Sequence, residues 1–190
     1  MSAPSSSIPN FNASGVLPPY VGSTPADVGG MSPYVVTIDQ LIARFNTSPE
    51  RKAILNGFLS FRQSLRSLGL SGWQWVDGSF LESVEDNESR PPRDIDILTF
   101  FARPASIPGG DWNAFVAANS GVFNPAQAKA SFRCDAYFVD TTFGPYFVVR
   151  QTGYWFGLFS HQRITEAWKG LLEISLPLTD VDAAARAALV

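Results

Sequence analysis

Two aspartates separated by one residue open a segment that has the pattern of a β-strand. The run from Asp94 through Phe101 begins with alternating polar and apolar residues and then becomes wholly apolar, as in a strand that enters a covered sheet. Because side chains alternate along a strand, Asp94 and Asp96 share one face while Ile95 points into the core. Two carboxylates this close repel each other unless a cation lies between them, and a hard divalent ion is the usual solution. The spacing predicts a site for Mg²⁺ or Mn²⁺.

A glycine–serine pair precedes these acids along the chain. Gly78 and Ser79 follow a predicted strand at 73–77, and a short helix is expected after them at 80–84. Glycine lets the backbone approach a ligand closely, and a serine at the start of a helix offers a hydroxyl and exposed N–H groups. Beside a metal-binding carboxylate pair, this bend is expected to hold the phosphates of a metal-bound polyphosphate.

This order of motifs resembles the polymerase-beta-like nucleotidyltransferase superfamily. The core pattern of that superfamily is Gly-Ser, a spacer, and Asp-x-Asp on the adjacent strand, and here it reads Gly78–Ser79, residues 80–93 and Asp94–Ile95–Asp96. The superfamily also uses a third carboxylate on a later strand. Asp135 matches that position best, with Asp140 as a rival. The resemblance therefore implies a catalytic and metal-binding set of Asp94, Asp96 and Asp135.

More of the chain is similar to a group of small, stand-alone members of that superfamily. These begin with a Gly-x-Leu-Pro arm, here Gly15–Pro18, and have a late Lys-Gly strand, here starting at Lys169. The spacer at 80–93 is long and acidic for the superfamily, and Arg90 and Arg93 are expected to offset its charge. Arg93 and Lys169 are the cations that we expect to reach the phosphates, with an ordinary solvated charge as the alternative for each.

Capping signals and periodicity indicate the elements that position the site. Thr37 and Gln40 have the spacing of a reciprocal N-cap and predict a helix through Phe45. Ser48 is expected to cap a second helix that ends at Gly69. Further strands are predicted at 131–139 and 169–176, further helices at 111–118 and from about 180 to 190, and an aromatic segment at 154–159 is expected to pack in the core.

The order of these elements predicts an α+β or α/β protein. The resemblance implies a nucleotidyltransferase-like fold with a small mixed β-sheet flanked by helices. Residues 1–34 are rich in Ser, Pro, Gly and Asn and lack periodicity, so we expect an extended N-terminal arm there and a single domain at 35–190. A hydrophobic content of 45% in 190 residues is ample for one buried core.

Charge and cysteine content restrict the partners. A net charge of −3 with 14 basic residues gives no DNA-binding patch and no general attraction to anionic membranes. No stretch has the pattern of a signal peptide or a membrane span. Cys134 is the single cysteine, which excludes an internal disulfide and fits a reducing compartment, so a cytoplasmic location is expected.

These expectations combine into one function and two alternatives. The resemblance implies a metal-dependent enzyme that moves a nucleoside monophosphate from an NTP to a protein or RNA hydroxyl, as minimal members do in toxin-antitoxin and phage-defence systems. The first alternative is a catalytically degenerate binding module for nucleotide or a protein partner, motivated by the acidic spacer and the lack of an acceptor domain. The second is a metal-dependent phosphohydrolase, which the Gly-Ser pair ahead of the acids disfavours.

Overall fold

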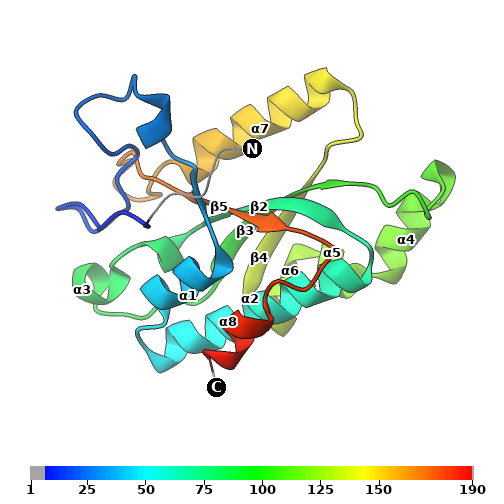
Figure 1. The fold of residues 1–190 in the computed structure, drawn as a ribbon, viewed down its shortest axis with the longest axis horizontal. Coiled ribbons are helices and arrows are strands. Elements are labelled where there is room, and N and C mark those ends of the chain that lie inside the picture. The colour runs from blue at the N-terminus through cyan, green and yellow to red at the C-terminus, as the bar shows by residue number, and fades with distance from the viewer. Residues whose placement is uncertain (1–6, 190) are drawn as a thin grey trace.

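A computed structural model describes residues 7–189 and contains one five-stranded mixed sheet (Figure 1). The strand order is β1-β5-β2-β3-β4, with β1 parallel to β5, β3 parallel to β4, and β2 antiparallel to both of its neighbours. The strands are Tyr34–Val36 (β1), Ser71–Asp77 (β2), Ile95–Ala102 (β3), Cys134–Asp140 (β4) and Leu172–Leu176 (β5). The predicted mixed α/β architecture is therefore confirmed.

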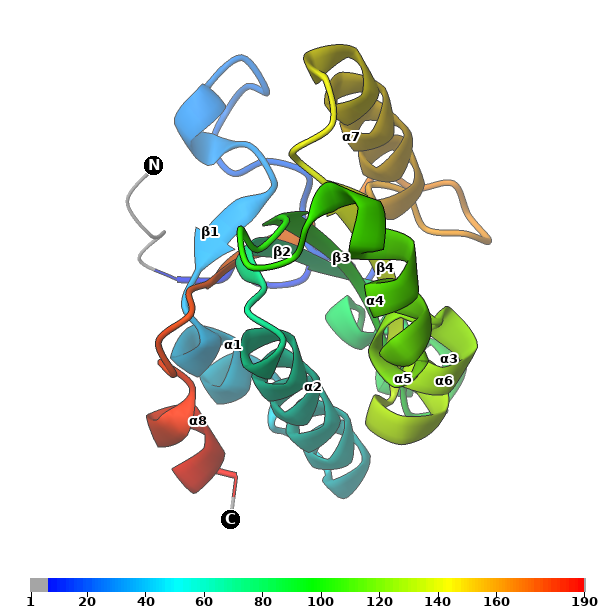
Figure 2. The ribbon, with the colours of Figure 1, turned by 90° about the vertical axis from the view of Figure 1, so that its right-hand side faces the viewer.

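Helices cover both faces of this sheet (Figure 2). Helices α1, α2, α6 and α8 lie on one face, and α7 lies alone on the other. The α-helices are Ile38–Phe45 (α1), Pro49–Ser67 (α2), Val84–Glu88 (α3), Trp112–Ala118 (α4), Ser120–Phe123 (α5), Pro125–Phe132 (α6), Pro145–Phe159 (α7) and Ala183–Ala187 (α8), and the 3-10 turns are Val28–Gly30 (η1), Ser79–Leu81 (η2) and Gly109–Asp111 (η3).

Local capping fixes the first two helices where the sequence predicts them. The Thr37 hydroxyl accepts from the Gln40 backbone N–H, and the Gln40 side chain accepts from the Thr37 N–H at 2.8 Å. Ser48 caps α2 by accepting from the backbone N–H of Arg51. After α2, Gly69 takes a φ of +76°, which glycine adopts without strain.

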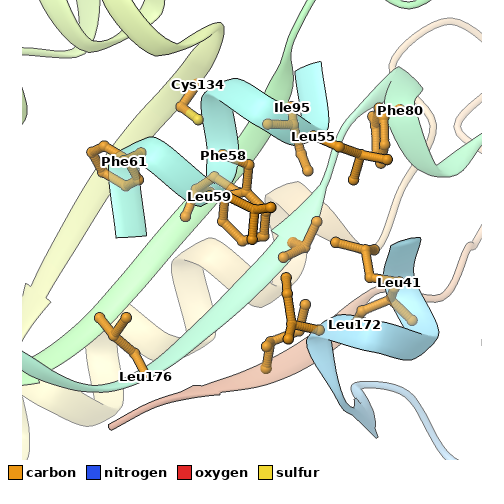
Figure 3. Packing of buried hydrophobic residues seen from close by; sticks show 14 of the residues in the cluster. Leu41, Leu55, Phe58, Leu59, Phe61, Phe80, Ile95, Cys134, Leu172 and Leu176 are labelled. Carbon is orange, nitrogen blue, oxygen red and sulfur yellow. The ribbon is translucent and has the colours of Figure 1, made fainter. Parts of the chain in front are cut away.

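The main hydrophobic core lies between α2 and the sheet (Figure 3). Phe58 and Phe61 of α2 are fully buried, as are Ile95 and Ile97 of β3 on the facing side of the sheet. Each such side chain contributes roughly 1.5–3 kcal/mol relative to its exposed state. The odd-numbered residues at the start of β3 thus anchor the strand and leave its even-numbered residues to the opposite face.

Several predicted boundaries are wrong, and tertiary structure gives the reasons. Ser131 and Phe132 end α6 instead of beginning a strand, because Arg133 takes a left-handed conformation (φ 57°) that stops the helix. The short helix expected at 80–84 is the 3-10 turn η2, and the expected loop after it contains α3. Strand β5 begins at Leu172 and not at Lys169, while β1, α5 and α6 were not predicted.

Helix α7 contains the aromatic segment 154–159. From the sequence we expect this segment to pack in the core, but no helix or strand is assigned to it. Only Phe159 is fully buried in it, while Tyr146, Val149 and Tyr154 are exposed. The apolar side chains of this helix are spread around most of its circumference, so its sequence shows no amphipathic stripe. In the part of the chain that the structure describes, no helix combines the length and apolar character needed to cross a bilayer.

The N-terminal segment from residue 7 to residue 33 packs on the rest of the chain. Val16 and Leu17 are fully buried, and Val16 forms an isolated antiparallel bridge with Glu82. The Leu17 carbonyl accepts from the Gly170 backbone N–H at 2.8 Å, and the Gly15 carbonyl accepts from the Ser83 N–H. The segment therefore contacts the chain at 82–83 and at 170.

Candidate active site

Three aspartates lie side by side across the central strands. The register pairs Asp77 of β2 with Asp96 of β3, and Asp96 with Asp135 of β4. Neighbouring strands are about 4.8 Å apart, so the three side chains form a continuous acidic row. Their sequence neighbours Ile95 and Cys134 are buried on the α2 side, which directs the row to the face that carries α7. Asp94 stands one residue before β3, at the edge of this row.

Gly78 brings the glycine–serine bend directly against the row. Its φ of +85° and ψ of −173° belong to a region that only glycine populates readily, and a Cβ added there would lie 2.6 Å from Oδ2 of Asp96. Ser79 is half-buried and begins the three-residue turn η2. The predicted neighbours Gly78, Ser79 and Asp96 are therefore together, although the element after Ser79 is too short to supply a helix dipole.

Lys129 of α6 joins the acids at the outer edge of the row. Its Nζ lies 2.7 Å from Oδ2 of Asp94 and 3.2 Å from Oδ2 of Asp135. The hydrogen bond to Asp94 raises the Lys129 pKa, because both carboxylates favour the charged ammonium. The two acids predicted on separate strands thus lie close enough to share one cation.

Asp96 has no comparable partner. Among residues 7–189, its carboxylate makes no ion pair and no side-chain hydrogen bond. Burial, together with the charges of Asp94 and Asp135, raises the Asp96 pKa to about 6. A half-buried carboxylate between two others is an energetically unfavourable group that a bound cation would stabilise.

Lys169 lies at the inner end of the row in a buried ion-pair cluster. Its Nζ is 2.6 Å from Glu82 and 3.1 Å from Asp77, and the side chain is 3% exposed. Burial acts to lower the Lys169 pKa, but Asp77 and Glu82 outweigh it and the pKa is raised. Burial raises the Asp77 pKa to about 7 against the pull of Lys169. Lys169 is next to the predicted site but is held by carboxylates, and it reaches a phosphate only by leaving them.

The acidic spacer is largely neutralised by internal partners. Glu85 accepts from Arg51 at 2.6 Å, an interaction that lowers the Glu85 pKa, and Glu82 is held by Lys169. Arg90 pairs with Glu88 of the same spacer. Arg93, predicted as a nucleotide-binding residue, is exposed just before Asp94 and makes no ion pair within the described part of the chain. An exposed cation that directly precedes Asp94 in the sequence is thus available to an anionic ligand.

The donor set has the chemistry that a hard divalent ion requires. Asp94, Asp96 and Asp135 offer carboxylate oxygens, the ligands that Mg²⁺ and Mn²⁺ prefer. Over residues 7–189, however, no three His, Cys, Asp or Glu side chains are arranged so that they already surround one ion. The oxygens of Asp94 and Asp135 face the ammonium of Lys129 instead. The residues fit the ion by type, and Lys129 provides the counter-charge for Asp94 and Asp135 in this structure.

Three residues of the site were not found by sequence reasoning. Asp77 was predicted as the end of a strand but not as part of the acidic row, although its place before Gly78 was a usable signal. Tyr137 lies two residues after Asp135 and donates its hydroxyl to that carboxylate, and burial together with Asp135 raises its pKa. Its ring packs on Trp155 of α7, with centroids 4.6 Å apart. Lys129 gave no signal, because the helix that carries it was not predicted.

The fold and these residues define a mixed α/β protein with an acidic row beside a glycine bend. The chain belongs to the family of unknown function DUF6932, whose model matches residues 9–175. The match includes the packed N-terminal segment and every residue of the row. No curated protein and no solved structure matches the chain.

Proposed function

We propose that this protein is a metal-dependent nucleotidyltransferase that moves a nucleoside monophosphate from an NTP to a hydroxyl of a protein or RNA. One observation carries the proposal: Asp94, Asp96 and Asp135 lie together on one face of the sheet, with the Gly78 bend against the middle acid. A glycine bend that leaves room for a ligand beside a carboxylate cluster suits a metal-bound triphosphate, because the carboxylates bind the metal ion and the phosphates fit against the bend.

We infer a nucleotidyltransferase-like fold on related grounds. The Gly-Ser pair directly follows β2, the Asp-x-Asp pair leads into the antiparallel neighbour β3, and the third acid is on β4, parallel to β3. This is the order that the resemblance implies. The acidic spacer does not oppose it, because Glu82 and Glu85 are engaged by Lys169 and Arg51.

The residues of the chain have distinct roles in this proposal. Asp94, Asp96 and Asp135 hold Mg²⁺ or Mn²⁺, which neutralises the triphosphate and lowers the pKa of the acceptor hydroxyl when bound. The Gly78–Ser79 bend donates to the outer phosphates and orients the α-phosphate for in-line attack, with pyrophosphate leaving. Tyr137 holds Asp135 through its hydroxyl. Arg93, which is exposed just before Asp94, is the further cation that we expect to reach the phosphates.

The setting and acceptor are proposed by analogy. A protein side chain or an RNA hydroxyl is the acceptor in minimal nucleotidyltransferases of toxin-antitoxin and phage-defence systems. A cytoplasmic location is supported by the single, buried Cys134.

Label transfer tests this function. The full chain is incubated with each α-labelled NTP, Mg²⁺ or Mn²⁺ and cell extract, beside a D94N/D96N variant and the control Asp111→Asn, which removes a carboxylate on η3. We expect label on protein or RNA with the wild type and the control, and none with D94N/D96N. Equal transfer by D94N/D96N would contradict the proposed site.

A binding module is the second candidate. It is favoured by one observation: Lys129 and Lys169 already neutralise acids of the row without any ligand. In that case the wild type binds nucleotide, the Asp94 and Asp96 variants lose this binding, and no label is transferred to any acceptor.

A further inference from the structure

The charges at the acidic row are balanced by two lysines in very different environments. Lys169 is 3% exposed and pairs with Asp77 and Glu82, so its ammonium stays buried as long as the chain is folded. The Lys129 side chain is 47% exposed and reaches Asp94 and Asp135 from the solvent side. Only the second ammonium can leave its carboxylates and return to water without opening the core.

The ammonium of Lys129 stands where a shared cation is required. It lies within 3.2 Å of oxygens from two of the three acids, and the third, Asp96, has no ion pair among the described residues. The ammonium contacts Oδ2 of both acids, and its positive charge repels a metal ion that approaches the same two oxygens at about 2.0–2.6 Å. A divalent ion that binds Oδ2 of both Asp94 and Asp135 therefore has to take the place of this ammonium.

The helix that carries Lys129 permits this exchange. Helix α6 has Ala128 as its one buried residue, and Lys129 projects from its last turn. Among residues 7–189, the ion pairs of its long, unbranched side chain are those to Asp94 and Asp135, whose side chains are themselves partly exposed. Its displacement costs two partly exposed ion pairs, which are individually weak.

We propose that Lys129 is an internal competitor for the divalent cation, occupying the position between Asp94 and Asp135 until the ion displaces it. This inference rests on the proposed function, because it assumes the metal site at those acids. Lys129 thereby lowers the affinity of the site for the metal ion alone. While the site holds no ion, its ammonium reduces the electrostatic repulsion between Asp94 and Asp135.

Mn²⁺ binding to the full chain tests this role without any catalytic readout. Free Mn²⁺ is measured by electron paramagnetic resonance during titration of the wild type, Lys129→Met and Lys129→Arg, with Lys52→Met as a control that removes an ammonium from α2. We expect Lys129→Met to bind Mn²⁺ about tenfold more tightly or better, because a full positive charge within about 5 Å of the ion is removed. Lys129→Arg and Lys52→Met should show no such gain.

The outcomes separate this inference from the proposed function. If D94N/D96N abolishes Mn²⁺ binding but Lys129→Met binds as the wild type does or more weakly, the metal site stands and the competitor role is overturned. The metal site and the competitor role are both overturned if neither the wild type nor Lys129→Met binds Mn²⁺. They are also both overturned if Lys129→Met still increases the Mn²⁺ affinity when it is combined with D94N/D96N.

Discussion

Two carboxylates of the row, the buried Asp77 and the half-buried Asp96, reduce the stability of the metal-free protein at neutral pH. Burial raises the pKa of Asp77 to about 7 and that of Asp96 to about 6. A raised carboxyl pKa means that the folded chain binds the proton more tightly than the unfolded chain. The stabilising contribution is therefore complete below about pH 4 and is lost as the pH rises through 6 to 7. Acids kept in this unfavourable state are typical of functional sites.

Replacing Asp96 should remove much of this pH dependence. In EDTA we expect Asp96→Asn to be more stable than the wild type by about 1–3 kcal/mol at pH 8, with the difference vanishing near pH 4. Urea unfolding across pH 4–8 measures it, and Asp111→Asn, an exposed carboxylate, serves as the control. A lower stability of Asp96→Asn at pH 8 would show that its charge is not destabilising.

Lys169 should prove essential for stability. Lys169→Met leaves Asp77 and Glu82 buried beside each other without a cation, which costs about 3–5 kcal/mol. Urea unfolding at pH 7 measures the loss, and Lys52→Met should change the free energy of unfolding by less than about 0.5 kcal/mol. A loss as small as that of the control would mean that the acids are rehydrated or protonated without difficulty.

Among the elements, the bend after β2 brings the backbone of Gly78 directly against the Asp96 carboxylate. Gly78→Ala forces a side chain into a conformation reserved for glycine and places its Cβ 2.6 Å from the Asp96 carboxylate. We expect a loss of about 1–3 kcal/mol in unfolding free energy together with weaker Mn²⁺ binding. Gly110→Ala is the matched control, because a Cβ there meets no atom within 4 Å. Unchanged Mn²⁺ binding in Gly78→Ala would separate the bend from the metal site.

Elements with local signals could be predicted, and those without them could not. The caps of α1 and α2 are formed by residues three positions apart, so the sequence predicts both helices and their first residues. Alternation along β3 likewise places Asp94 and Asp96 toward the same face. Helices α6 and α7 lack such a stripe, since one alternates alanine with polar residues and the other carries apolar residues around most of its circumference. Lys129 and Trp155 could not be assigned to the site for that reason.

At the scale of the whole molecule, a buried ion pair ties the C-terminal segment to α2. Arg62 donates to both carboxylate oxygens of Asp182 at 2.7 and 2.9 Å, and both side chains are fully buried. Arg62 also donates to Gln74 of β2, and Arg66 donates to Asp182. Residues distant in sequence thus form one hydrogen-bonded network on the face of the sheet that carries α2. No short-range pattern in the sequence indicates this long-range pairing, because its members lie on α2, β2 and the segment before α8.

Breaking this network should destabilise the protein without touching the acidic row. Asp182→Ala leaves Arg62 buried without its counter-charge, and we expect a loss of about 3–5 kcal/mol in the free energy of unfolding. Urea unfolding measures the loss, and Mn²⁺ affinity below the transition should remain that of the wild type. A change in stability within about 0.5 kcal/mol would contradict the role of the pair.

Metal-dependent nucleotide binding tests the central claim most directly. Isothermal titration calorimetry is performed with each of the common NTPs on the wild type and on D94N/D96N, in Mn²⁺ and in EDTA. We expect the wild type to bind at least one NTP in Mn²⁺ and not in EDTA, and D94N/D96N to bind it in neither. Equal affinity of the wild type and D94N/D96N, or binding that is unaffected by EDTA, would contradict this expectation.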